Sequence, residues 1–139
     1  MKFSEFADIF PQQGLLPAKA EVSGISADSR KVGAGELFFA LAGVKADGAS
    51  FAEEAARKGA TAIIARPGAL SSDPGVPVIE TDDPRRVLAL CAARLFPRQP
   101  EIMVAVTGTS GKTSVASFTR QIWEHAGLPA ASIGTTGVV

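Results

Sequence analysis

Short apolar runs separated by turns rich in glycine and proline dominate the hydrophobic pattern of residues 1–98. Residues 37–41 (LFFAL) are apolar without interruption, which is typical of a strand buried on both faces of a sheet. The pattern predicts further strands at residues 22–27, 61–65 and 76–80. Helical patterns lie between and before these runs, so we expect an α/β fold in which helices cover a small sheet.

Helices are predicted where apolar residues recur at helical spacing. Residues 3–10 show this spacing before a proline, and residues 51–58 form a second helical segment that ends at Gly59, a suitable residue just beyond a helix. A third helix begins at Asp83 and Pro84, with aspartate as the N-cap and proline at the first helical position.

The remainder of the chain has a different organisation. A strand is predicted at residues 102–106, followed by a loop of small residues at 107–113 and a helix, and another strand is expected to start at residues 130–133. One strand–helix unit cannot cover its own sheet. We therefore expect a small complete domain at residues 1–98, followed at residues 99–139 by the opening of a truncated nucleotide-binding domain.

The predicted helix after the loop carries an apolar stripe on one side. In a complete domain this stripe would be covered by further strands, so we expect it to be an exposed apolar patch in this chain. The stripe comprises Val115, Phe118, Ile122 and Trp123.

The loop before this helix has the residues that a nucleoside triphosphate requires. Its backbone N–H groups and the following helix N-terminus can bind phosphate. Lys112 would reach the β- and γ-phosphates as the catalytic residue, and the Thr113 hydroxyl would ligate Mg²⁺. Val106 stands where the general pattern has glycine, and a turn with an incidental lysine is the alternative interpretation. The candidate ATP-binding residues are Gly108, Thr109, Ser110, Gly111, Lys112, Thr113 and Ser114.

Composition and charge exclude several classes of protein. The 14 basic and 14 acidic residues give zero formal net charge, which argues against a nucleic-acid-binding or anionic-membrane-binding surface. No apolar run approaches the roughly 20 residues of a membrane span, and Lys2 interrupts the start of any signal peptide. We expect a cytoplasmic protein.

Cys91 and His125 are each single, so neither a disulfide nor a zinc site is predicted, and Cys91 is expected to be buried.

Two separate motifs resemble one family. Residues 107–113 (TGTSGKT) resemble the ATP loop of the Mur ligases of bacterial cell-wall synthesis, in which the position of Ser110 is often asparagine. Residues 28–32 (DSRKV), 35–41 (GELFFAL) and 46–48 (ADG) resemble the N-terminal domain shared by the ligases that act third and fourth in that pathway.

Within the family, three segments favour the branch that adds the third amino acid over the branch that adds the terminal dipeptide. They are residues 82–86 (DDPRR), 106–109 (VTGT) and 132–135 (SIGT). The resemblance implies an ATP- and Mg²⁺-dependent amide ligase acting on UDP-N-acetylmuramoyl-L-alanyl-D-glutamate. The substrate carboxylate would become an acyl phosphate, from which the amine of meso-diaminopimelate or L-lysine displaces phosphate.

The resemblance also implies which residues hold the UDP end of that substrate: Ala27, Ser29, Val44, Lys45 and Ala46. Ser29 could hydrogen-bond uracil or phosphate. Many relatives have His-Gln in place of Val44-Lys45, so Val44 could contribute only its backbone, whereas Lys45 could pair with the diphosphate. Without the resemblance, residues 28–30 would be interpreted as a turn closed by its own side chains.

The family's further metal ligands, its modified lysine and its amino-acid-binding C-terminal domain are not in this sequence, so we expect a fragment that is inactive by itself. Two alternatives stay open. The chain could be a stand-alone module that binds UDP-sugar peptides without chemistry, or a phosphate-loop protein of another class.

Overall fold

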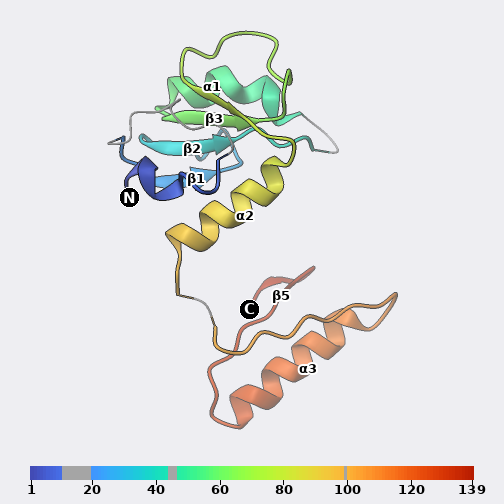
Figure 1. The fold of residues 1–139 in the computed structure, drawn as a ribbon. Helices are drawn as coiled ribbons and strands as arrows, with labels where there is room; N and C mark the ends of the chain where they lie inside the picture. Colours follow the sequence, from blue (N-terminus) through green and yellow to red (C-terminus); the bar gives the residue numbers. More distant parts are fainter. Residues whose placement is uncertain (11–19, 44–46, 99) are drawn as a thin grey trace. The chain divides into compact units, whose positions relative to one another are not determined.

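The computed structural model describes residues 1–10, 20–43, 47–98 and 100–139. These residues form two compact units, Met1–Gln99 and Pro100–Val139 (Figure 1).

The first unit is built on a sheet of four parallel strands in the order β1-β2-β3-β4. The strands are β1 (Gly24–Ser26), β2 (Glu36–Phe39), β3 (Ala62–Ala65) and β4 (Val78–Glu80). Each strand pairs with the next one along the chain, so all four carboxyl ends lie at one edge of the sheet. The predicted α/β fold is confirmed.

Both faces of this sheet are buried. The helical elements of the first unit are η1 (Phe3–Phe6), η2 (Gly48–Phe51), α1 (Ala52–Arg57) and α2 (Pro84–Leu95). Figure 1 shows α1 on one side of the sheet and α2 on the other. Leu37 and Phe39 pack in a cluster with residues of η1 and α2, whereas Phe38 packs in a cluster with residues of α1. This alternation explains why residues 37–39 of β2 are all apolar.

Local sequence signals account for the ends of the helices. The Asp83 side chain accepts a hydrogen bond from the Arg86 N–H at 3.0 Å, and Pro84 occupies the first turn of α2, as predicted. Gly59 follows α1 with a φ of +99°, a conformation that L-residues with side chains rarely adopt. The segment at residues 3–10 differs from the prediction, because only Phe3–Phe6 is helical and it is a 3₁₀ helix.

The loop after β2 is closed by close contact between the backbone at residues 41–42 and the backbone at residues 47–48. Ala42 and Asp47 form an isolated antiparallel bridge. The Gly48 N–H donates to the Leu41 carbonyl oxygen at 2.9 Å, and a Cβ at Gly48 would lie 2.6 Å from both the nitrogen and the oxygen of Leu41. Only glycine fits this position without moving the backbone.

Gly48→Ala is therefore expected to lower the free energy of unfolding by about 2 kcal/mol, because overpacking against backbone cannot be relieved by a rotamer change. Urea unfolding measures the effect. Gly33→Ala is the matched control, since the nearest atom to a Cβ there is a Glu36 side-chain carbon at 3.6 Å and the φ of Gly33 is not positive. Equal stabilities of the two variants would contradict the backbone contact.

The second unit contains α3 (Lys112–His125) and a short antiparallel hairpin of β5 (Ile133–Gly134) and β6 (Gly137–Val138). The strand predicted at residues 102–106 is wrong, because this segment is irregular. A strand satisfies its backbone N–H and C=O groups by pairing with a neighbour, and within the part of the chain that the structure describes no strand pairs with residues 102–106.

Three residues of the apolar stripe of α3 are exposed, as the sequence predicts for a unit without covering strands, whereas Trp123 is half-buried. The exposed fractions are 50% for Val115, 61% for Phe118 and 66% for Ile122. Such a patch is uncommon on the surface of a complete soluble domain.

Candidate functional site

The carboxyl edge of the four-stranded sheet gathers the loops that the sequence connects with substrate binding. Ala27 and Ser29 follow β1 directly, and the loop closed by Ala42 and Asp47 follows β2. Open α/β sheets bind ligands at this edge. The other predicted substrate residues, Val44, Lys45 and Ala46, lie outside the described residues.

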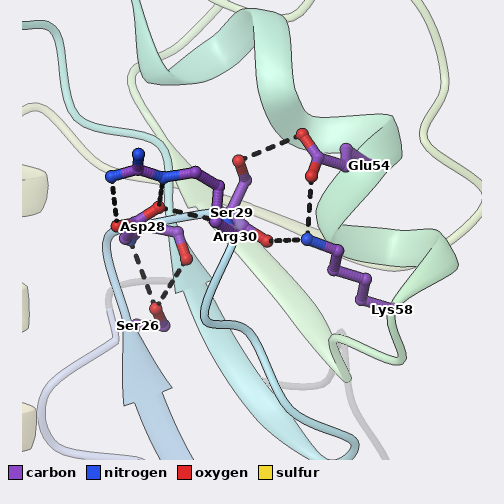
Figure 2. Close-up of polar contacts among 6 residues, drawn as sticks. All are labelled: Ser26, Asp28, Ser29, Arg30, Glu54 and Lys58. Carbon is purple, nitrogen blue, oxygen red and sulfur yellow. Dashed lines mark hydrogen bonds and ion pairs between the residues drawn. The ribbon is translucent and has the colours of Figure 1, made fainter.

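The turn after β1 is closed by its own side chains, as the alternative interpretation of residues 28–30 expects (Figure 2). Asp28 Oδ1 accepts from the Arg30 backbone N–H at 3.0 Å and from Arg30 Nε at 2.9 Å, while Asp28 Oδ2 accepts from Arg30 Nη2 at 2.8 Å. Ser26 Oγ donates to the Asp28 carbonyl oxygen at 3.0 Å and accepts from the Asp28 N–H at 3.2 Å. These bonds define the local shape of the turn.

Ser29 points away from this local network and toward α1. Its hydroxyl donates to Glu54 Oε2 at 3.1 Å, and the residue is only 7% exposed. Lys58 Nζ donates to the Ser29 carbonyl oxygen at 2.9 Å and to Glu54 Oε1 at 2.8 Å (Figure 2). Glu54 and Lys58 were not predicted as site residues, although their spacing of four residues is typical of an ion pair on a helix.

The charges of this region balance. The hydrogen bonds from Arg30 lower the pKa of Asp28 from 3.8 to about 2, and Asp28 raises the pKa of Arg30. The hydrogen bond from Lys58, followed by the one from Ser29, lowers the pKa of Glu54. Both carboxylates are therefore ionised at neutral pH, each beside a cation.

Acid should weaken the turn after β1. The pKa of Asp28 lies below its ordinary value, so the stabilisation from its ionised form is complete above pH 3.8 and is lost as the pH falls toward about 2. Asp28→Asn is expected to reduce the change in unfolding midpoint across this interval, measured by thermal unfolding at a series of pH values. Asp82→Asn, at an exposed position, is the matched control for the loss of one surface carboxylate. An unchanged slope in Asp28→Asn would contradict this prediction.

The loop after β2 is also held by a cation from a helix. Arg85 Nη2, in the first turn of α2, donates to the Ala42 carbonyl oxygen at 2.8 Å. Lys58 Nζ likewise donates to the carbonyl oxygen of Ser29 in the loop after β1. A backbone carbonyl of each loop, that of Ser29 or of Ala42, thus accepts a hydrogen bond from a cationic side chain at the C-terminal end of α1 or in the first turn of α2.

In the second unit, the predicted ATP-binding residues lie together at the N-terminus of α3. Gly108 and Gly111 have φ values of +142° and +76°, and Gly111 is the N-cap of the helix. Lys112 Nζ donates to the Gly108 carbonyl oxygen, and the Thr113 and Thr135 hydroxyls are 3.2 Å apart. An exposed loop with glycines at positive φ before a helix N-terminus suits a phosphate group. The individual ATP and Mg²⁺ contacts stay predictions.

Cys91 is fully buried on α2, as expected. Burial raises the pKa of its thiol to about 12.

Within the described ranges, no helix is long and apolar enough to cross a membrane. The same residues contain no group of three or more His, Cys, Asp or Glu side chains that could hold a metal ion.

The parallel four-stranded sheet with helices on its faces places the chain in the α/β class of proteins. The model of the Mur ligase family, catalytic domain, matches residues 21–95, which is more than half of the chain. The chain therefore belongs to the Mur ligase family, and the predicted resemblance is confirmed. The match ends before the Gly-Lys-Thr loop, so it does not test the ATP-binding residues.

Curated relatives match both units. A UDP-N-acetylmuramoyl-L-alanyl-D-glutamate–2,6-diaminopimelate ligase of Chelativorans sp. (strain BNC1) is 68% identical over 139 residues, which cover 100% of this chain and 29% of the relative. A protein of the same name from Mesorhizobium japonicum is 60% identical, with the same coverage. The chain thus spans about three tenths of the length of these relatives.

Two solved structures are similar as well. A structure of a UDP-N-acetylmuramoyl-L-alanyl-D-glutamate–2,6-diaminopimelate ligase matches 100% of this chain and 29% of its own chain, with a TM-score of 0.74 and 29% identity. The crystal structure of MurF ligase from Thermotoga maritima in complex with ADP matches 82% of this chain and 25% of its own, with a TM-score of 0.57 and 29% identity.

Proposed function

We propose that this chain is the N-terminal part of an ATP-dependent ligase of peptidoglycan precursor synthesis. The ligase would add the third residue to UDP-N-acetylmuramoyl-L-alanyl-D-glutamate in the cytoplasm. The observation that carries this proposal is the 68% identity across both units to a relative named as a 2,6-diaminopimelate ligase. That name favours diaminopimelate over L-lysine as the added amino acid.

In this proposal the first unit holds the UDP end of the substrate at the carboxyl edge of the sheet. The turn with Ala27 and Ser29 would form one side of the site. The loop with Val44, Lys45 and Ala46 would form the other, with Lys45 available to pair with the diphosphate. The hydrogen bonds of Lys58 and Arg85 to backbone carbonyls support a site whose loops are positioned before the ligand arrives.

The second unit would hold ATP. The residues fit a triphosphate, because glycines at positive φ allow the backbone to approach the phosphates and α3 directs its N-terminus at them. When bound, ATP supplies the phosphoryl group that activates the substrate carboxylate. Lys112 would exchange its bond to the Gly108 carbonyl for phosphate oxygens, and the Thr113 hydroxyl would be a ligand of Mg²⁺.

A chimera tests this function directly. The 139 residues of this chain replace the matching segment of the Chelativorans ligase, and formation of the tripeptide product from UDP-N-acetylmuramoyl-L-alanyl-D-glutamate, ATP and diaminopimelate is measured. We expect a kcat within about tenfold of that of the intact relative, because the two sequences are 68% identical over the exchanged segment.

An inactive but folded chimera that still binds the UDP substrate would favour the alternative of a binding module without chemistry. A folded chimera that binds neither ATP nor the UDP substrate would overturn the proposed function.

A further inference from the structure

We propose that Glu54 and Lys58 are positioning residues for the first substrate loop, residues 27–30. Ser29 would then act through this pair rather than by presenting its hydroxyl to the ligand. The inference rests on the proposed function, because it concerns how the same site holds the UDP end of the substrate.

The single proton of the Ser29 hydroxyl is already donated to a neighbouring residue. A serine hydroxyl has one proton to donate, and that of Ser29 goes to Glu54 Oε2 at 3.1 Å. The residue is 7% exposed, and Figure 2 shows its side chain directed at α1. A phosphate oxygen or a uracil carbonyl only accepts hydrogen bonds, so the Ser29 hydroxyl has no proton left for either.

Lys58 completes the attachment at a second atom of the same residue. Its ammonium group donates both to the Ser29 carbonyl oxygen at 2.9 Å and to Glu54 Oε1 at 2.8 Å. The side chain and the backbone of Ser29 are therefore both bound to α1. Hydrogen bonds to charged groups are about twice as strong as those between neutral groups, so two such bonds on one residue restrict the loop effectively.

This attachment has a different role from the bonds between Asp28 and Arg30. Those bonds join residues two positions apart and set the shape of the turn alone. The bonds to Glu54 and Lys58 span 25 and 29 residues, and they fix the turn relative to the helix layer that covers the sheet. Without them the turn keeps its shape but loses its direction at the carboxyl edge. The backbone N–H and C=O groups of residues 27–30 would then no longer be oriented to hydrogen-bond the ligand.

The test is UDP binding by the 139-residue chain, measured by isothermal titration calorimetry. Every protein carries Lys112→Ala, so that UDP bound through its diphosphate at the loop before α3 does not contribute to the measured affinity. Glu54→Ala is expected to weaken UDP binding about tenfold, within the range of coupling energies between contacting residues. Glu54→Gln keeps an acceptor for the Ser29 hydroxyl and should stay within about threefold of the reference chain.

Glu53→Ala is the matched control, since Glu53 is the neighbouring glutamate of α1 and bonds to Ser72 instead. It should bind UDP as the reference chain does. The thermal unfolding midpoint of each variant shows whether the substitution has destabilised the fold in general. A general destabilisation would lower the midpoints of Glu53→Ala and Glu54→Ala alike, and the two variants would then bind UDP with similar affinity.

A double-mutant cycle distinguishes positioning from direct contact. If Ser29 acts through Glu54, adding Ser29→Ala to Glu54→Ala weakens binding by no more than about twofold further. A full additional loss would place the hydroxyl on the ligand and overturn the inference, and so would equal affinities of Glu54→Ala and Glu53→Ala. Absence of UDP binding by the reference chain would overturn the proposed function itself, and the inference with it.

Discussion

Replacing Lys112 with alanine in the chimeric ligase is expected to lower kcat by about a thousandfold. Phosphoryl transfer depends on positioning and on neutralising the charge of the phosphates, and removal of one such group costs on the order of 10²–10³ or more. Binding of the UDP substrate should change little, because the predicted substrate loops belong to the first unit and Lys112 to the second. Tripeptide formation and substrate calorimetry on the same preparation measure the two effects.

Arg98→Ala is the control for the loss of one positive charge, since Arg98 is exposed and lies outside the Gly-Lys-Thr loop. Its kcat should match that of the unaltered chimera. If Lys112→Ala abolished substrate binding together with ligation, the assignment of Lys112 to ATP alone would be wrong.

Phe6→Ala is expected to lower the free energy of unfolding of the first unit by about 4 kcal/mol. Phe6 is fully buried, lies 6.4 Å from the ring of Phe10 between centroids, and belongs to the core cluster on the α2 face. Loss of a buried phenylalanine costs about 3–5 kcal/mol. Since domains of this size are stable by only about 5–15 kcal/mol, the variant should unfold at a much lower urea concentration, as circular dichroism would show.

Phe51→Ala is the matched control, because Phe51 is 38% exposed and lies in η2. It should cost less than about 1 kcal/mol. A similar loss in both variants would mean that η1 does not seal the sheet as the structure describes.

The sequence predicts those elements of the fold that local chemistry specifies. The unbroken apolar run at residues 37–41 predicts a strand buried on two faces, and the Asp83-Pro84 pair predicts the start of α2. Both were correct because a strand's burial and a helix's cap depend on adjacent residues. Gly59 is similar, since the left-handed conformation after α1 requires glycine.

Elements that depend on distant partners were predicted less well. Residues 102–106 have the composition of a strand but no neighbour among the described strands, so they stay irregular. Phe3, Phe6 and Phe10 are all buried in one core cluster, yet the segment forms only one short 3₁₀ helix.

The same limit applies to the candidate site. The order of motifs places Ala27 and Ser29 after β1, at the carboxyl edge of the sheet. Glu54 and Lys58 were missed, since their contacts with Ser29 cross 25 and 29 residues and no local pattern encodes them. The orientation of the turn is therefore a property of the folded unit and not of the turn's own sequence.

The division into two units also separates the chain's natural reporters. Trp123 is the only tryptophan in the sequence, which has no tyrosine, and it lies in α3 of the second unit. Cys91, the only thiol, is buried in the first unit. Intrinsic fluorescence therefore follows the second unit alone, while the rate of thiol labelling follows opening of the first. The unfolding of each unit can therefore be observed in one sample without introducing another fluorophore or another cysteine.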